Sequence, residues 1–520
     1  MARRASEEGL DPDPVDEATA TAPRGPSFEG AQPSSLLVNS GAMLTARAYG
    51  ILVTGALTIY AIRTLSTAEY GRYAIALAFV AIFQLFSEMG ISSLALREMS
   101  QRPERERQTL AVALGAEALT SVVAVGLLLP IALALGYPGE VLLLLAVGAG
   151  TIFFQGLLSP IETSFRARRV FEGSLVPALQ STVTALVGFP LIASGGGAAG
   201  LMLATLAGAA VAVPAGLALL QRRLRLRPAF EGARGAIVPF LRSASPIALT
   251  GAAWILYERI DVLLLSKLAG LEAVALYNVP LTIVHYALLV PAIVGTTFFP
   301  LLSAALKQDV GSAQAPLVLM ARVFVFFSIP LAIGLVVGGE DLLTLVFGGR
   351  YAASAQPMAI LSATIVLGFL SLLGWYALLG AHQERRMVVV IVAGLVANVA
   401  LNLVLIPAYG VSGAATSLVL SEAFIVGSEV VLIRRHLFAL PLGRLVLKPA
   451  LAGLAVIPLA ILLAPVSQLL SALVAAPAYM AVLLAMRYIR REEWEPVTRP
   501  LGEGLRRVGR RSARSSDARR

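Results

Sequence analysis

Long apolar stretches follow one another along most of this chain, and short polar or charged segments separate them. A helix needs roughly 20 apolar residues to cross a ~30 Å hydrocarbon core, and a soluble core does not need such runs in succession. The pattern predicts an all-α polytopic membrane protein with about fourteen spans. The predicted spans are 36–62, 73–93, 109–135, 140–161, 174–194, 198–220, 244–266, 274–299, 316–337, 356–379, 387–406, 411–433, 446–464 and 467–487.

The first six predicted spans and the next six resemble each other, which indicates an internal duplication. Matching residues fall at equivalent positions of the two six-helix units. The pairs are Arg63 and Tyr73 with Lys267 and Tyr277, Arg168–Arg169 with Arg385–Arg386, and Gly197 and Gly200 with Gly410 and Gly413. Repeats of this kind are common in secondary transporters, whose substrate route lies between the repeats. The sequence therefore predicts two pseudo-symmetric six-helix lobes followed by two further helices.

The predicted domain organisation follows from these spans. An acidic, Pro- and Ser-rich tail (1–35) is expected to be disordered and cytoplasmic. A first lobe (36–220) is followed by a basic linker (221–243) with apolar residues that could rest on the membrane surface, and then by a second lobe (244–433). Two extra spans (446–487) and an Arg-rich cytoplasmic tail (488–520) complete the chain.

Composition supports a membrane protein and excludes several kinds of site. Hydrophobic residues make up 57% of the chain and charged residues 14%, and the mean hydropathy is +0.80. The chain has no Cys, which excludes disulfides, thiolate metal sites and cysteine nucleophiles. Three His without a nearby cluster of acids argue against a catalytic metal, and we expect no metal and no cofactor.

The net charge of +10 is placed in a way that argues against nucleic-acid binding. Nearly all the basic residues fall in alternate loops and in the C-terminal tail, which is the positive-inside pattern of cytoplasmic loops. The opposite loops hold only Arg63, Arg72, Lys267 and Arg350. We therefore expect a multi-pass protein of the bacterial cytoplasmic membrane with both termini cytoplasmic, attracted to anionic lipids.

Several ordered stretches resemble the polysaccharide-exporter (oligosaccharide flippase) family of the multidrug/oligosaccharidyl-lipid/polysaccharide (MOP) superfamily. They lie within roughly residues 35 to 485. They are Ala61–Tyr73, Glu88–Ile91, Leu94–Glu98, Glu258–Asp261 with Leu264 and Tyr277, Phe347–Tyr351, Asn398–Pro407 and Tyr409–Ala415. The resemblance implies a non-enzymatic, MATE-like flippase that moves a polyprenyl-diphosphate-linked oligosaccharide from the inner to the outer leaflet for polysaccharide assembly. Glycan polymerases or glycosyltransferases are possible partners, for which the C-terminal tail could be a docking site, and we expect a monomer.

Charged residues inside spans are costly and are therefore candidates for function. Arg47 and Arg259 are cationic candidates for the diphosphate, since a guanidinium forms bidentate hydrogen bonds with phosphate. Trp254, Glu258 and Asp261 share one helical face, so the two acids are expected to line a cavity while Arg259 points away from them. Each of these could instead form a structural ion pair between helices.

Further polar residues within the spans complete the candidate set. Tyr257, Asn398 and Asn402 are candidates for substrate contact, although hydrogen bonding between helices is the default role of the two Asn. Glu117, Glu422 and His285, together with Glu258 and Asp261, are candidates for ion coupling. Glu117 or Glu422 could instead pair with Arg47 or Arg259.

Three other functions remain open from the sequence. A lipid II-type flippase would also have fourteen spans and a cationic cavity. A multidrug or cation antiporter of the same superfamily usually has twelve spans and acidic membrane residues. A non-transporting scaffold for cell-wall enzymes would lack a polar cavity that reaches mid-membrane. An integral glycan polymerase or ligase is disfavoured, because no long outer loop exists to hold catalytic residues.

Overall fold

The computed structural model describes residues 33–168 and 170–489, and this part of the chain is helical without strands. Most of the two predicted tails, residues 1–32 and 490–520, lies outside the described residues. The helices, which short 3₁₀ or π turns join in places, are α1 Pro33–Thr64, α2 Thr67–Glu88, α3 Ile91–Gln101, α4 Glu106–Ala134, α5 Gly139–Arg168, α6 Leu175–Ala193, α7 Gly197–Leu219, α8 Ala233–Leu268, α9 Leu271–Ala287, α10 Leu289–Gln308, α11 Gln314–Phe347, α12 Ala355–Gly380, α13 Glu384–His436, α14 Leu442–Leu463 and α15 Gln468–Ala485.

The predicted all-α membrane fold class is confirmed. Twelve helices of the described part are long and apolar enough to cross a membrane. One of them, α13, consists of two helices that match the predicted spans 387–406 and 411–433; the chain reverses direction at Gly410 (φ 56°, ψ −128°), so Arg386 and His436 at its two ends lie 3.2 Å apart. The predicted span 244–266 lies within α8.

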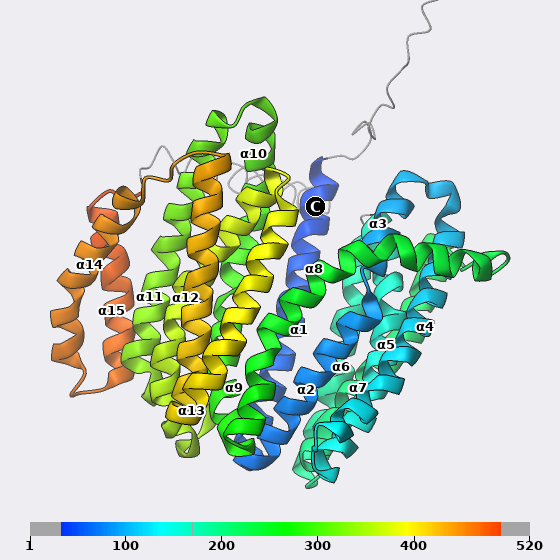
Figure 1. The fold of residues 1–520 in the computed structure, drawn as a ribbon, viewed down its shortest axis with the longest axis horizontal. Helices are drawn as coiled ribbons and strands as arrows, with labels where there is room; N and C mark the ends of the chain where they lie inside the picture. Colours follow the sequence, from blue (N-terminus) through cyan, green and yellow to red (C-terminus); the bar gives the residue numbers. More distant parts are fainter. Residues whose placement is uncertain (1–32, 169, 490–520) are drawn as a thin grey trace, which may run out of the picture.

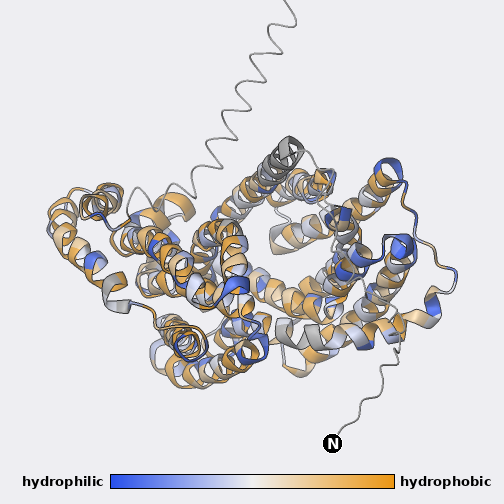
Figure 2. Cartoon of the chain, turned by 90° about the horizontal axis from the view of Figure 1, so that it is seen from above, coloured by the Kyte–Doolittle hydropathy of each residue, from blue (hydrophilic) through white to orange (hydrophobic). Residues whose placement is uncertain are grey.

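The helices form two groups, with α8 running between them (Figure 1). We call α1–α7 the first half and α8–α13 the second half. α8 packs against α2 and α4 of the first half and against α13 of the second, so it connects the two structurally as well as in sequence. α14 and α15 pack against α11 and lie at the outer edge of the second half. Seen from above, the two halves surround a common centre (Figure 2).

The helices depart from the predicted spans in three places. α8 begins at Ala233, so part of the segment expected to be a linker continues the membrane helix. The predicted span 274–299 is interrupted at Leu288, three residues before Pro291, which has no N–H to donate to the preceding turn. The short helix α3 follows α2, in a segment expected to be a loop.

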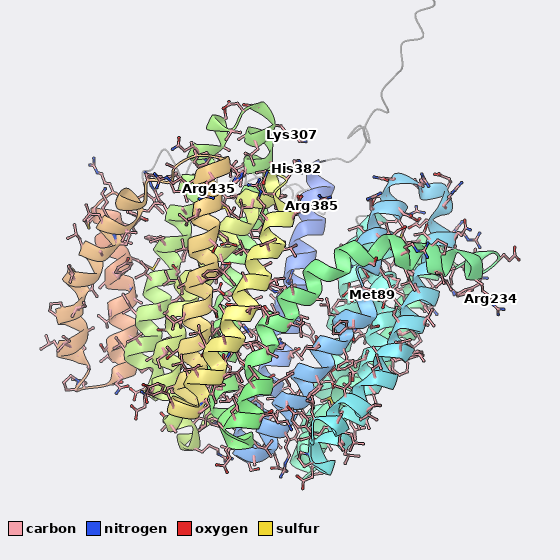
Figure 3. The ribbon with its side chains drawn as sticks, in the orientation of Figure 1. Met89, Arg234, Lys307, His382, Arg385 and Arg435 are labelled. Carbon is pink, nitrogen blue, oxygen red and sulfur yellow. The ribbon has the colours of Figure 1, made fainter. Side chains whose placement is uncertain are left out.

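The surface of the helices is suited to lipid. Large apolar side chains are exposed on both halves and on the last two helices, such as Leu186 at 70%, Leu52 at 72% and Leu462 at 74%. At one end of the bundle Lys307, Arg385 and Arg435 lie together, and Arg234 lies near the start of α8 (Figure 3). The basic residues therefore mark one end of the membrane-spanning bundle.

Candidate functional site

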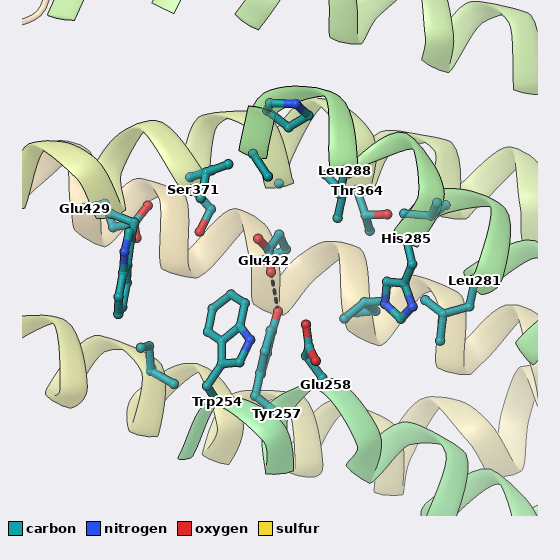
Figure 4. Close-up of a pocket in the computed structure, with 18 of the residues that line it drawn as sticks. Trp254, Tyr257, Glu258, Leu281, His285, Leu288, Thr364, Ser371, Glu422 and Glu429 are labelled. Carbon is teal, nitrogen blue, oxygen red and sulfur yellow. Dashed lines mark hydrogen bonds between the residues drawn. The ribbon is translucent and has the colours of Figure 1, made fainter. Parts of the chain in front are cut away.

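A cavity of about 580 Å³ lies inside the second half, between α8, α9, α10, α12 and α13 (Figure 4). Its lining is mostly apolar, with a small number of polar and aromatic side chains, which is the usual make-up of a small-molecule site. The polar and aromatic lining residues are Trp254, Tyr257, Glu258, His285, Thr364, Ser371, Trp375, Glu422 and Glu429. Four sequence-predicted candidates besides Glu422 therefore meet here: Trp254, Tyr257, Glu258 and His285.

Three carboxylates reach this cavity from two helices. Glu258 comes from α8, whereas Glu422 and Glu429 stand seven residues apart on α13 and so share one face of that helix. Glu422 and Glu429 are 8% and 7% exposed. The Tyr257 hydroxyl donates a hydrogen bond to Glu422 Oε2 at 2.6 Å and ties α8 to α13 across the cavity.

Asp261 does not line the cavity, although the sequence placed it on the same face as Glu258. Asp261 is 1% exposed and accepts hydrogen bonds from the Tyr277 hydroxyl at 2.8 Å and from Asn402 Nδ2 at 2.6 Å. The two positions are three residues apart and therefore about 60° apart around α8. This rotation is enough to turn Asp261 from the cavity into the interface with α9 and α13.

A chain of hydrogen bonds joins buried Asp261 to the cavity. Asn402 Nδ2 also donates to Asn398 Oδ1 at 2.9 Å, and Asn398 Nδ2 donates to Ser421 Oγ at 3.2 Å. Ser421 Oγ lies 3.4 Å from the Tyr257 hydroxyl, which holds Glu422. Asn398 and Asn402 are both fully buried, so they act between helices and do not line the cavity.

The two cationic candidates lie outside the cavity lining. Arg47 is exposed on α1, and within the described residues no salt bridge joins Arg47 or Arg259 to an acid. The alternative pairing with Glu117 or Glu422 is therefore not seen in this part of the chain. Arg259 lies close enough to Glu258 and His285 for its charge to act on both.

Arg47 is exposed on α1 and falls on the same helical face as Thr58. Thr58 lies eleven residues further along, which is three helical turns, and so occupies the same face. Thr58 interacts with Tyr286 of α9, and a Cβ on neighbouring Gly55 would lie 3.7 Å from the Tyr286 hydroxyl. Arg47 thus shares the helical face by which Thr58 contacts the second half, and it lies three turns closer to the basic end.

Glu117 occupies a separate buried position in the first half. It is fully buried on α4, and Ser87 Oγ of α2 lies 3.4 Å from its Oε2. Ser87 also hydrogen-bonds to Ser121 at 2.6 Å. The Oε1 atom of Glu117 has no hydrogen-bond partner among the described residues. The structure thus places this ion-coupling candidate in the opposite half from the other four.

The halves are joined at the end opposite the basic residues, which we call the closed end. Arg63, beside the end of α1, donates to the carbonyl oxygens of Val346 (2.7 Å) and Leu345 at the end of α11. In the opposite direction, Arg350 of the second half donates to the carbonyl oxygen of Leu65 at 2.7 Å. Each guanidinium thus meets carbonyls at the C-terminal end of a helix from the other half, where the helix dipole favours a cation.

Further contacts at the closed end bring α2 and α4 against α8 and α9. Lys267 Nζ donates to the carbonyl of Leu135 at 2.6 Å and lies 3.5 Å from the centre of the Tyr137 ring. Asn278 Nδ2 donates to the Tyr70 hydroxyl at 3.1 Å. Three of the four basic residues that depart from the positive-inside pattern, Arg63, Lys267 and Arg350, therefore bond across the two halves.

Sequence reasoning missed Glu429, Trp375 and the cross-half role of Arg63, Lys267 and Arg350. Glu429 could have been found, since it stands two helical turns after Glu422 on the same face. The cross-half bonds could not have been found, because their acceptors are backbone carbonyls distant in sequence that carry no residue signature.

Comparisons with known proteins agree with this architecture. A family model described as polysaccharide biosynthesis protein matches residues 61–356. A protein of Haloferax volcanii named as a low-salt glycan biosynthesis flippase is 24% identical over 237 residues, which are 45% of this chain and 49% of that protein. A protein of Shigella dysenteriae named as an O-antigen transporter is 29% identical over 195 residues, which are 36% and 48% of the two chains. The chain thus spans about half the length of these curated relatives.

Solved structures share the fold at low sequence identity. The lipid II flippase MurJ in an inward closed conformation matches with a TM-score of 0.71 and 14% identity, over 86% of this chain and 98% of that one. An inward-facing multidrug resistance MATE family transporter of the MOP superfamily matches with a TM-score of 0.58 and 15% identity, over 79% and 96%. These likenesses show the fold, and the family match covers more than half of the sequence. The chain is a member of the polysaccharide biosynthesis protein family, with the fold of MOP-superfamily transporters.

Proposed function

We propose that this protein is a flippase that moves a polyprenyl-diphosphate-linked oligosaccharide from the inner to the outer leaflet of the bacterial cytoplasmic membrane. The family match is the observation that carries this proposal. The two relatives named as a glycan flippase and an O-antigen transporter support the substrate class. Movement would occur by alternating access, with the two halves opening in turn to each side of the membrane.

The orientation of this proposal follows from charge. The end that carries Arg234, Lys307, Arg385 and Arg435 faces the cytoplasm, because cytoplasmic loops collect Arg and Lys. The closed end then faces outward. This arrangement suits a transporter that receives its substrate from the cytoplasmic side while Arg63, Lys267 and Arg350 keep the outer side shut.

The diphosphate is assigned to the space between the halves. Arg47 is exposed on α1, and its guanidinium supplies the paired hydrogen bonds that a phosphate accepts. Arg259 is the second cationic candidate: its Nε has no hydrogen-bond partner among the described residues. A cation in these places offsets the cost of bringing a diphosphate between membrane helices.

Ion coupling is assigned to the acids of the spans. Asp261 is the strongest candidate, because its hydrogen-bonded chain through Asn402, Asn398 and Ser421 ends at Glu422 in the cavity. A proton or cation at Asp261 would also act on Tyr277, whose neighbour Asn278 bonds to Tyr70 at the closed end. A proton or cation bound at Asp261 would thereby change the strength of the contacts that hold the closed end together.

The proposed function is tested by replacing Arg47. Arg47→Ala is expected to lower glycan export at least about tenfold, the loss of about 1.4 kcal/mol of substrate interaction, while the protein remains in the membrane. The measurement is the amount of surface glycan together with the lipid-linked intermediate that accumulates. Arg97→Ala, an exposed position on α3, serves as the control. Unchanged export in the Arg47 variant would remove Arg47 from the substrate route.

Lipid analysis of a deletion strain tests the substrate class itself. Accumulation of a polyprenyl-diphosphate-linked oligosaccharide supports the proposal. Accumulation of the lipid-linked peptidoglycan precursor would instead assign the protein as a lipid II-type flippase. Export of small cations without any change in lipid-linked glycans would point to an antiporter.

A further inference from the structure

We infer that the cavity of the second half is a sugar pocket that accepts rings bearing an amino group and excludes acidic sugars. This inference rests on the proposed function, since it concerns the glycan that the flippase carries. The cavity measures about 580 Å³, within the range of pockets that enclose small molecules. Its charge, its unpartnered carboxylate oxygen and its aromatic side chains each point to this class of ligand.

The cavity is lined by acids, which do not suit a diphosphate. Glu258, Glu422 and Glu429 all line it, whereas no Arg or Lys does so among the described residues. Glu258 interacts electrostatically with Glu422, and Glu422 with Glu429, so the three acids form one interacting group. Like charges that share a low-dielectric site repel one another unless a proton or cation joins them. The part of a substrate that enters here is therefore neutral or positive.

Glu429 offers an unused acceptor at this site. It is 7% exposed, and its Oε2 has no hydrogen-bond partner among the described residues. An unsatisfied buried acceptor costs about 1–3 kcal/mol, more for a charged group. A protonated amino group has three donors and a positive charge, so it can satisfy this oxygen and also reduce the repulsion between the acids.

The aromatic lining suits a sugar ring that carries such a group. Trp254 and Trp375 line the cavity together with Tyr257, whose ring lies 6.2 Å from that of Trp254. Aromatic faces pack against the apolar C–H face of a ring and attract a cation placed above them. The carboxylates can then accept hydrogen bonds from the sugar hydroxyls as well as from the amino group.

Glu258 and Arg259 are adjacent in sequence and can bind substrate groups of opposite charge. Glu258 lines the cavity, whereas Arg259 does not. An amino sugar in the cavity and a diphosphate on the Arg259 side would each meet the opposite charge. An acidic sugar would meet three carboxylates instead, so the same arrangement excludes it.

Intrinsic fluorescence can report on this pocket directly, because the chain has three Trp, namely Trp254, Trp375 and Trp494. In a Trp494→Phe background only the two cavity tryptophans remain. The purified full-length protein in lipid nanodiscs is titrated at mildly acidic pH with glucosamine trimer, N-acetylglucosamine trimer and galacturonic acid trimer. We expect saturable quenching by the first, at least about tenfold weaker binding of the acetylated trimer, and no binding of the acidic one.

The carboxylates are then tested by substitution. Glu429→Gln is expected to weaken binding of the glucosamine trimer about tenfold, and Glu258→Gln gives a second, independent variant should the first fold poorly. Glu384→Gln, at an exposed position at the start of α13, is the matched control. Equal binding of the three trimers, or wild-type affinity in well-folded Glu429 and Glu258 variants, would overturn the inference. So would binding of tetraphenylphosphonium without binding of glucosamine trimer, which would make the cavity an organic-cation site.

The test separates this inference from the proposed function. A deletion strain that accumulates a lipid-linked glycan supports flipping whether or not the trimers bind. If that strain accumulates such a glycan and the glucosamine trimer fails to bind, only the sugar pocket is lost. If no lipid-linked glycan accumulates, the proposed function itself is lost.

Discussion

At the scale of single residues, the helices packed around α8 give Glu258 and Asp261 different surroundings. Glu258 faces the cavity, whereas Asp261 is enclosed by Tyr277 and Asn402. The sequence correctly identified both as candidates, because a carboxylate inside a span requires a reason. It grouped them on one face because the direction in which α9 and α13 pack against α8 is not encoded in the spacing along α8 alone.

Asn402 can be tested as the support of Asp261. Asn402→Ala removes the hydrogen bond to Asp261 Oδ1 and leaves that buried oxygen without this partner, so the variant should lose about 1–3 kcal/mol of stability. The measurement is thermal unfolding of the purified protein in detergent. Leu403→Ala, at a 53% exposed neighbouring position, should change the melting temperature much less. An equal effect of the two substitutions would contradict a supporting role for Asn402.

At the scale of helices, the closed end depends on a close approach of backbones. A Cβ on Gly71 of α2 would lie 2.0 Å from the carbonyl oxygen of Leu271, at the start of α9. No side chain fits between the two helices at this distance. Glycine is thus needed here for the contact itself, whereas its φ is not unusual.

Gly71→Ala should therefore hold the closed end apart. The chain has no Cys, so Ser266→Cys, at a position that bonds to Tyr137 across the halves at 2.8 Å, can report on opening. An impermeant thiol reagent should label this cysteine several-fold faster in the Gly71→Ala variant. Gly139→Ala, where a Cβ meets nothing within 4 Å, is the control at the same end. Identical labelling rates in both variants would show that the Gly71 contact does not govern closure.

The reversal between the two helices of α13 depends on a second glycine. Gly410 has φ 56° and ψ −128°, a backbone conformation that residues with a side chain rarely adopt. Gly410→Ala should destabilise the protein by about 1–3 kcal/mol, seen as a lower melting temperature. Gly427→Ala, in the second helix of α13 with open space around it, should be neutral or slightly stabilising. A melting temperature unchanged by Gly410→Ala would mean that the turn between the two helices of α13 does not depend on glycine at this position.

At the scale of the whole molecule, charge at the two ends predicts the orientation in the membrane. Ser100 on α3 lies at the basic end, and Ser194 after α6 lies at the closed end; both are exposed. On intact cells an impermeant maleimide should label Ser194→Cys and not Ser100→Cys, because the basic end is expected to be cytoplasmic. Permeabilised cells, in which both should react, provide the control. The reverse pattern on intact cells would invert the proposed orientation.

The sequence by itself determined the membrane-spanning helices, the fold class, the family and the place of the charged candidates along each helix. Apolar length and the cost of burying charge act on each segment separately, so they can be read without knowing its neighbours. Only the tertiary structure decided that Glu429 and Trp375 join Glu258 in one cavity, that Asp261 leaves it, and that Arg63 and Arg350 bond across the halves. These outcomes depend on how helices distant in sequence rotate and pack against one another.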